Sequence, residues 1–210
     1  MTRRGRGTFL VLEGIDGVGK STLVKALARA LRRRGLSVAV RREPADPRLG
    51  ALAQSAAAED PWTGAVYFTV DRQLASSDLE RDLFENEVVL QDRSFYSTLA
   101  YQGSAIPPAD RRRLAELQRS ATRTPDRVVL LDLAPEEAVR RLGGRDLQRG
   151  PLERLRTLRR VARAYRALAR SHHWQVLDAR APPRELLRQV LEGLDLPAPT
   201  RGRHPARRRR

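Results

Sequence analysis

One stretch of the chain has the residue types and spacing of a phosphate-binding loop. The segment Gly14–Thr22 reads G-I-D-G-V-G-K-S-T, after the apolar run Phe9–Leu12 and before a stretch with helical periodicity. Its glycines let the backbone turn N–H groups toward a phosphate, and the start of the following helix adds positive potential. Lys20 would bridge the β- and γ-phosphates of ATP, and the Ser21 hydroxyl would bind Mg²⁺. The candidate ATP-binding residues are therefore Gly14, Ile15, Asp16, Gly17, Val18, Gly19, Lys20, Ser21 and Thr22.

Charged residues follow other apolar runs. Asp92 and Arg93 come directly after the run Val88–Leu90 and its neighbour Gln91. A guanidinium at a strand end can hold a phosphate with two parallel hydrogen bonds, and a strand-terminal acid can contact Mg²⁺, often through water. Asp16 is a carboxylate within an anion-binding turn, where its negative charge is electrostatically unfavourable unless it has a functional role. We expect it to accept a hydrogen bond from a sugar hydroxyl or to position a phosphoryl group.

Apolar runs alternate with helical patterns along the chain. Strands are predicted at Phe9–Leu12, Ser37–Arg41, Val88–Leu90, Val128–Asp132 and Trp174–Asp178. Helices are predicted around Leu23–Leu31, Gly50–Ala58, Trp62–Leu74, Asp110–Ala121, Pro135–Leu142, Leu155–Leu168 and Leu187–Leu194. Strands of continuous apolar residues separated by helices indicate a parallel sheet covered on both faces. We therefore predict an α/β, P-loop NTPase-type, doubly wound sheet of five parallel strands with a short lid.

Composition limits the class of protein. The 210 residues contain no cysteine, which excludes a disulfide scaffold, a thiolate zinc site and a cysteine nucleophile. No apolar run approaches the roughly 20 residues that span a bilayer, and the N-terminal apolar run is too short for a signal peptide. We expect a soluble, cytoplasmic protein with no membrane partner. The expected organisation is a basic disordered N-terminus (1–8), one domain (9–196, lid about 143–151) and a basic disordered tail (197–210).

The net charge is +16, and nine of these charges are arginines of the two tails. A basic chain suits nucleic acid or small phosphorylated ligands. No aromatic residue is interleaved with the tail arginines to stack on bases, so we expect phosphorylated small molecules rather than nucleic acid. A nucleotide-gated nucleic-acid binder that uses Arg207–Arg210 as an arm is the non-enzyme alternative.

Beyond the phosphate loop, the sequence resembles the thymidylate kinase family, the dTMP kinases among the nucleoside monophosphate kinases. The resemblance covers about Phe9 to Leu194, and the run Ala100–Gly103 (A-Y-Q-G) is its most specific element. The other matching segments are Glu13–Asp16, Arg42–Pro44 with Gly50, Phe68–Arg72, Asp92–Arg93, Ser97–Thr98, Pro125–Asp126, Leu131–Leu133 and Val176–Ala179. This resemblance implies transfer of the γ-phosphoryl group of ATP·Mg²⁺ to dTMP, and a homodimer formed through helices near 62–74 and 110–121.

The resemblance also implies roles on the base side of a dTMP site. Phe68 would stack on thymine, although its place on a helical apolar stripe also fits a plain core residue. Arg72 would hydrogen-bond a thymine carbonyl, and Thr98 with Gln102 would read the base edge. Tyr101 would pack beneath the deoxyribose and disfavour a ribose 2′-hydroxyl.

On the phosphate side, the resemblance implies that Arg93 would hold the dTMP phosphate and that Asp16 would contact the region of the sugar 3′-hydroxyl. Glu43 would lie near the acceptor and the metal, and Arg42 and Ser97 complete the predicted dTMP site. Asp92 joins Ser21 as a predicted Mg²⁺ ligand.

Members of this family keep a catalytic arginine either in the phosphate loop or in a lid over the ATP. Because this loop has Val18 and no basic residue between Gly14 and Gly19, the resemblance implies an arginine in the lid. Family resemblance favours Arg149, with Arg145 as the reserve. Phosphoryl transfer spreads charge over the equatorial oxygens, and a cation brought by lid closure can neutralise it.

Three positions depart from the family pattern and leave the base selectivity open, namely Ala45, Gln54 and Ser94. The run Asp92–Ser97 also resembles deoxyribonucleoside kinases, in which the acid after the second strand deprotonates a 5′-hydroxyl. A deoxyribonucleoside kinase with Glu43 as general base is therefore the alternative activity.

Overall fold

A computed structural model describes residues 7–143 and 151–194 of the chain. The lid arginines Arg145 and Arg149 and both Arg-rich tails, apart from Gly7 and Thr8, lie outside the described residues. Within these two described ranges, five strands form one sheet with the order β2-β3-β1-β4-β5, and every neighbouring pair is parallel. The strands are β1 (Thr8–Glu13), β2 (Val38–Arg42), β3 (Val88–Asp92), β4 (Arg127–Asp132) and β5 (Gln175–Asp178). The predicted five-stranded parallel sheet is confirmed, with β1 beginning at Thr8.

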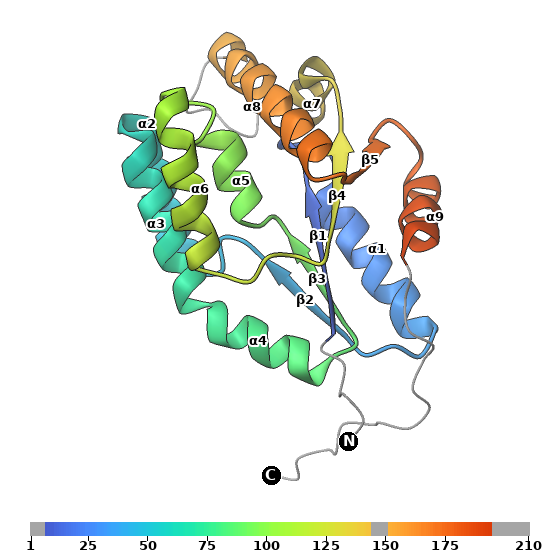
Figure 1. Cartoon of the computed structure of the whole chain (residues 1–210). Helices are drawn as coiled ribbons and strands as arrows, with labels where there is room; N and C mark the ends of the chain where they lie inside the picture. The colour runs from blue at the N-terminus through green and yellow to red at the C-terminus, as the bar shows by residue number, and fades with distance from the viewer. Residues whose placement is uncertain (1–6, 144–150, 195–210) are drawn as a thin grey trace.

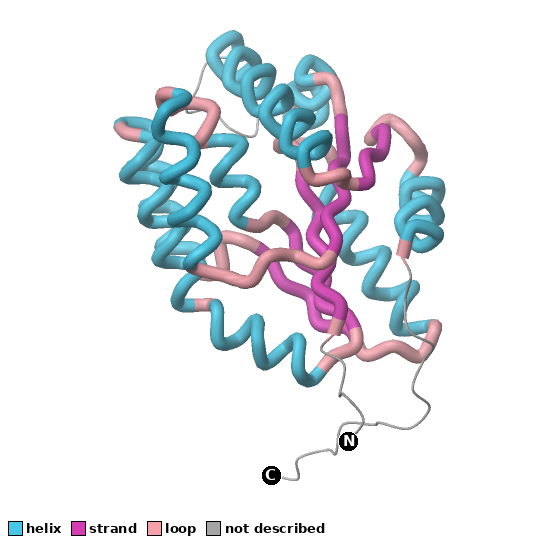
Figure 2. Tube along the Cα trace, viewed as in Figure 1, coloured by secondary structure: helices cyan, strands magenta, loops and turns pink. Residues whose placement is uncertain are grey.

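The helices surround this sheet, as Figure 2 shows by the magenta strands between cyan helices. They are α1 (Lys20–Arg33), α2 (Pro47–Glu59), α3 (Pro61–Leu74), α4 (Ser76–Glu85), α5 (Phe95–Tyr101), α6 (Arg111–Ser120), α7 (Pro135–Leu142), α8 (Pro151–Ser171) and α9 (Pro183–Gly193), with a 3₁₀ turn at Pro108–Asp110. Helices α4 and α5 were not predicted. Most of α4 is charged or polar, so only Leu79 and Leu83 mark its buried side. Helix α5 is only seven residues long, too short to show a helical period.

The strands bury alternate side chains on opposite faces of the sheet. On one face, Leu10 and Leu12 of β1 belong to a core with Leu27 of α1. On the other face, Phe9 and Val11 pack with Leu79 and Leu83 of α4. Both faces of the central strand are therefore covered, which is why its sequence is apolar without alternation. In Figure 1, α1 and α9 lie on one side of the sheet and α3, α4 and α6 on the other.

The strand order brings together residues that are far apart in sequence. Leu12 of β1 and Arg42 of β2 both pair with Asp92 of β3, so all three strands end at one edge. Ligands of open parallel sheets bind beyond the carboxyl ends of the strands. The loop after β1, the segment after β2 and Arg93 therefore share one rim. Among the described residues, no helix is long and apolar enough to cross a membrane.

Candidate active site

The loop between β1 and α1 has a backbone that only glycine tolerates at several positions. Gly14, Gly17 and Gly19 have φ values of 143°, 84° and 95°. A Cβ at Gly14 would lie 2.5 Å from the Leu131 carbonyl oxygen, and one at Gly17 would lie 2.8 Å from the Ala138 carbonyl oxygen. Helix α1 begins at Lys20, directly after the loop. The loop thus ends at a helix N-terminus, the arrangement that attracts phosphate.

Lys20 is buried beneath this loop. Its Nζ donates to the carbonyl oxygens of Gly14 and Ile15, each at 2.9 Å. Burial lowers the pKa of Lys20 to about 8, and the charge of Arg93 adds to this effect although Asp16 opposes it. An ammonium group has three donors, so one N–H remains beyond these two contacts. A polyphosphate beside Lys20 would favour its charged form and offset the burial.

Ser21 and Asp92 form a small oxygen cluster next to the loop. The Ser21 hydroxyl donates to Asp92 Oδ2 at 2.5 Å. Asp92 Oδ1 is buried and has no hydrogen-bond partner among the described residues. Oxygen ligands of this kind suit Mg²⁺, which also retains several waters and binds substrate phosphates. The two residues therefore fit the predicted metal, although the described residues contain no group of three or more acidic, histidine or cysteine side chains that could hold an ion alone.

Arg93 directly follows β3 and points to the phosphate loop. Its Nη2 donates to Asp16 Oδ1 at 2.5 Å, and its Nη1 donates to Ser97 Oγ at 3.1 Å. Tyr101 donates its hydroxyl to Asp16 Oδ2 at 2.9 Å, and its ring lies 5.4 Å from the Arg93 guanidinium carbon. Burial would raise the pKa of Asp16, but the charges of Arg93 and Lys20 outweigh it and keep that pKa below its usual value. Sequence reasoning grouped these side chains, and the structure brings Asp16, Arg93, Ser97 and Tyr101 together.

Glu13 is a buried acid for which sequence reasoning gave no role beyond a family match. One carboxylate oxygen accepts from the Ser94 backbone N–H and hydroxyl, both at 2.8 Å. The other accepts from Ser97 Oγ at 2.8 Å and from the Tyr165 hydroxyl at 2.9 Å. Burial raises the pKa of Glu13, which the charge of Arg93 and these hydrogen bonds only partly oppose. The signal in the sequence is an acid that ends an otherwise apolar strand.

The Glu13 contacts give Ser94 a structural role. Its side chain accepts from the Tyr96 N–H at the start of α5 and donates to Glu13. An aromatic residue at this position would offer neither of these side-chain bonds. The second hydroxyl, on Tyr165, comes from α8, the helix that follows the predicted lid.

A second buried network surrounds Arg72 of α3, which is only 4% exposed. Arg72 Nε and Nη2 donate to Glu43 Oε2 at 2.9 and 2.7 Å, and Nη1 donates to Gln118 Oε1 at 2.5 Å. Arg72 Nη2 also approaches Thr98 Oγ1 at 3.3 Å, while Gln91 donates to Glu43 Oε1 at 3.1 Å. Sequence reasoning included Glu43, Arg72 and Thr98 but missed Gln91 and Gln118. Both missed residues are buried amides within elements that otherwise bury apolar side chains.

The remaining predicted residues surround this network less closely. Phe68 is half-buried on α3, four residues before Arg72, and Gln102 is half-buried just after α5. Arg42 is exposed at the end of β2. Gln54 is exposed on α2, whereas the Ala45 N–H is held by Asp71 Oδ2 at 2.8 Å. No described contact joins Phe68 or Gln102 to Arg72.

Together, this sheet and loop define a P-loop kinase of the nucleotide-binding α/β class. The chain belongs to the thymidylate kinase family, whose model, described as "Thymidylate kinase", matches residues 12–190. It is 33% identical over 184 residues to a probable thymidylate kinase of Sulfurisphaera tokodaii, covering 88% of this chain and 94% of that protein. It is 36% identical over 210 residues to a thymidylate kinase of a Synechococcus species, covering 91% and 99%. A thymidylate kinase of Paracidovorax citrulli is 37% identical over 204 residues, covering 89% and 92%.

Proposed function

We propose that the protein transfers the γ-phosphoryl group of ATP to dTMP, giving dTDP and ADP. The observation that carries the proposal is the meeting of Lys20 and Arg93 at the ends of two adjacent strands, β1 and β3, with Asp16 between them. Two separate cations at one rim suit one polyphosphate and one monophosphate. Membership of the thymidylate kinase family and the names of the relatives support dTMP as the acceptor.

At the donor end, the loop N–H groups and Lys20 bind the β- and γ-phosphates. Mg²⁺, held by Ser21 and Asp92, would neutralise charge on the same phosphate oxygens when bound. Lys20 meets the phosphates already oriented by the carbonyl oxygens of Gly14 and Ile15. Little reorganisation is needed as charge develops, which is how fixed cations lower a barrier.

At the acceptor end, Arg93 binds the dTMP phosphate. Its contacts with Asp16 and Ser97 fix the guanidinium, and the phosphate shares the remaining N–H groups. A phosphate monoester oxygen is already anionic, so attack on the γ-phosphorus requires no general base. In the free protein, Glu43 accepts hydrogen bonds on both oxygens, from Arg72 and Gln91. The relatives, named thymidylate kinases, also do not favour the alternative of a deoxyribonucleoside kinase that uses Glu43 as base.

On the base side, we propose that thymine lies between Phe68 and the side chains of α5. Arg72 donates to a thymine carbonyl, and Thr98 and Gln102 read the base edge. Tyr101, fixed by its hydrogen bond to Asp16, lies beneath the deoxyribose. Support comes from the match of these positions to the family pattern and from the burial of Arg72 and Thr98.

We also propose that a lid arginine neutralises the transferring group, Arg149 first and Arg145 as the reserve. Replacing Arg149 with alanine should lower kcat much more than it raises the KM for dTMP. A kcat loss confined to Arg145→Ala would transfer the role to Arg145, and normal kcat in both variants would remove it.

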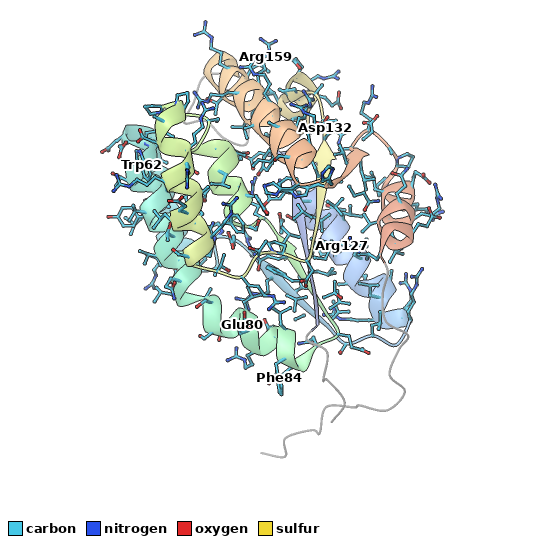
Figure 3. All side chains as sticks on the ribbon, viewed as in Figure 1. Trp62, Glu80, Phe84, Arg127, Asp132 and Arg159 are labelled. Carbon is cyan, nitrogen blue, oxygen red and sulfur yellow. The ribbon has the colours of Figure 1, made fainter. Side chains whose placement is uncertain are left out.

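A homodimer through α3 is supported by a row of exposed apolar side chains. Val66, Tyr67, Val70 and Leu74 are 47, 37, 42 and 68% exposed and lie at helical spacing on one face. Helix α6 instead exposes mainly charged residues, so α3 supplies the apolar part of the proposed interface. Figure 3 shows Trp62 near the start of α3 and Phe84 projecting from the neighbouring α4. Val70→Glu should convert the dimer into a monomer, and light scattering would show this as a halved molar mass. A dimer mass that stays unchanged in this variant would count against an interface through α3.

The deciding experiment for the reaction offers dTMP, dUMP, dCMP, dGMP and thymidine separately with ATP·Mg²⁺ and follows ADP release. dTMP should have the highest kcat/KM. A higher value for thymidine would favour the nucleoside kinase, and a higher value for another monophosphate would overturn the substrate assignment. We further propose a cytoplasmic location, in keeping with the proposed use of ATP and dTMP as substrates.

A further inference from the structure

Gln118 of α6 is a fully buried polar side chain to which the kinase chemistry gives no role. Its Oε1 accepts from Arg72 Nη1 at 2.5 Å, and its Nε2 donates to Thr69 Oγ1 at 2.8 Å. Burying an amide is costly unless both of its ends find hydrogen-bond partners. Both ends of the Gln118 amide have a hydrogen-bond partner, and one of the two partners is Arg72, the residue proposed to bind the base.

The orientation of the Gln118 amide follows from its second partner. Thr69 donates its single hydroxyl hydrogen to the Ala65 carbonyl oxygen at 2.8 Å. Thr69 can therefore only accept from Gln118, and the NH₂ end of the amide must face Thr69. The carbonyl end then faces Arg72. The chain of hydrogen bonds from α3 to α6 thus gives the amide a single favourable orientation.

The same contacts nearly use up the donors of Arg72. A guanidinium has five N–H groups in a rigid plane. Nε donates to Glu43, Nη2 donates to Glu43 and Thr98, and Nη1 donates to Gln118. Within the described part of the chain, only the second N–H of Nη1 lacks an acceptor in these hydrogen bonds. Because Gln118 holds Nη1, it determines which donor remains for a ligand.

We propose that Gln118 is a positioning residue for base selection, which holds Arg72 so that its remaining N–H meets a carbonyl oxygen of the pyrimidine. This inference rests on the proposed role of Arg72 in the dTMP site. A ring carbonyl accepts that N–H, whereas the exocyclic amine of cytosine presents a second donor. The arrangement therefore selects pyrimidines with a carbonyl at this edge and disfavours those with an amine.

The test replaces Gln118 with leucine, which has a similar volume and removes both hydrogen bonds. kcat and KM are measured with dTMP and with dCMP at saturating ATP. We expect the KM for dTMP to rise about tenfold and the dTMP/dCMP ratio of kcat/KM to fall about tenfold, because a buried hydrogen bond to a charged group is lost. kcat for dTMP should stay within about twofold, since Arg72 does not contact the transferring phosphoryl group. Glu116→Ala, on the exposed side of α6, is the matched control and should behave as the unmodified protein.

Thr69→Val is the second variant, and it decides the matter if Gln118→Leu does not fold. It removes the acceptor that orients the amide, together with the Thr69 bond to the Ala65 carbonyl oxygen, but leaves the Gln118 bond to Arg72 in place, so the KM and the ratio should shift in the same direction by about threefold. An unchanged KM and ratio in a folded Gln118→Leu, or in Thr69→Val if that variant alone folds, would overturn the inference.

Arg72→Ala separates the two possible failures. If this variant raises the KM for dTMP and lowers the ratio while Gln118→Leu changes neither, the positioning role is wrong and the role of Arg72 stands. If Arg72→Ala also changes neither quantity, the proposed contact of Arg72 with the base is wrong and the inference falls with it.

Discussion

The donor loop (Gly14–Thr22) and the base-side network (Glu43, Thr69, Arg72, Gln91, Thr98 and Gln118) are built in different ways. The donor loop is one continuous segment, which combines glycines at positive φ, one lysine and a helix N-terminus. The base-side network takes its members from the segment after β2, from α3, β3, α5 and α6. Its hydrogen bonds join residues 26 to 49 positions apart.

This difference explains how each region tolerates change. A loop closed by local geometry depends on its own residues and on the strand beside it. A network assembled from five separate segments depends on how helices pack, so a distant substitution can alter it. We therefore expect variants to affect ATP and dTMP parameters separately, and the following experiments test that separation.

The largest effect is expected at Lys20. Lys20→Met removes the cation proposed to face the transferring phosphates, and kcat should fall by about 10³-fold. The KM for dTMP should change little, because the acceptor cation Arg93 remains. Burial of the ammonium lowers its pKa to about 8, so its removal should not lower the thermal midpoint. Steady-state kinetics and thermal unfolding check both points, and a large rise in the dTMP KM would contradict the separation.

The second largest effect is expected from Arg93→Ala. Without the guanidinium, kcat/KM for dTMP should fall by about 100-fold, because a fixed charge-assisted contact to phosphate is lost. The KM for ATP should stay within about twofold. Asp16→Asn serves as a comparison, since it removes the ion pair but keeps the cation. Equal losses for both substrates in Arg93→Ala would show that the two phosphate sites are not separable.

A smaller effect is expected from Gly64→Ala, away from both phosphates. A Cβ on Gly64 of α3 would lie 2.3 Å from the Cβ of Ala57 on α2. Overpacking of this kind costs about 1–3 kcal/mol. Urea unfolding should show the loss of unfolding free energy. Because α3 also carries Arg72, the KM for dTMP should rise while the KM for ATP does not. Ala58→Gly, at an exposed site on α2, controls for a general loss of helix stability. A shift in the ATP KM alone would reverse the expected coupling.

The smallest effect is a change in pH dependence for Glu13→Gln. The pKa of Glu13 is raised in the folded protein from an ordinary value near 4.5, mainly by burial. Its contribution to stability is therefore complete below that ordinary pKa and is lost as the pH rises through the folded pKa. Relative to Glu13→Gln, the unmodified protein should lose unfolding free energy as the pH rises above the ordinary carboxyl pKa of 4.5, as measured by urea unfolding at a series of pH values. A difference that stays constant or grows with pH would contradict this assignment.

Sequence reasoning was most successful where the physical signal is local. Each strand has an apolar run, and the loop after β1 has glycines at the positions that require positive φ. Helix α5 was missed because its seven residues are too few to show a helical period.

The base-side and Glu13 contacts were less accessible to sequence reasoning. Glu43, Arg72 and Thr98 were found only through family resemblance, because no local pattern joins the segment after β2 to α3 and α5. Gln118 and Glu13 contact other site residues, Arg72 for one and Ser94 and Ser97 for the other, so their residue types alone do not indicate a chemical role. Their shared signal is a polar side chain where the pattern demands burial, and its meaning depends on partners elsewhere in the chain.

The pairing of β1 with β3 has a consequence for how Lys20 and Arg93 are placed relative to each other. The carbonyl oxygens of Gly14 and Ile15, directly after β1, hold Lys20, and Arg93 is the first residue after β3, the strand that pairs with β1. The relative placement of these two cations is therefore set by the backbone hydrogen bonds of two neighbouring strands more than by helix packing. The helices that carry the base-side network could therefore be remodelled for a different acceptor while Lys20 and Arg93 keep their places.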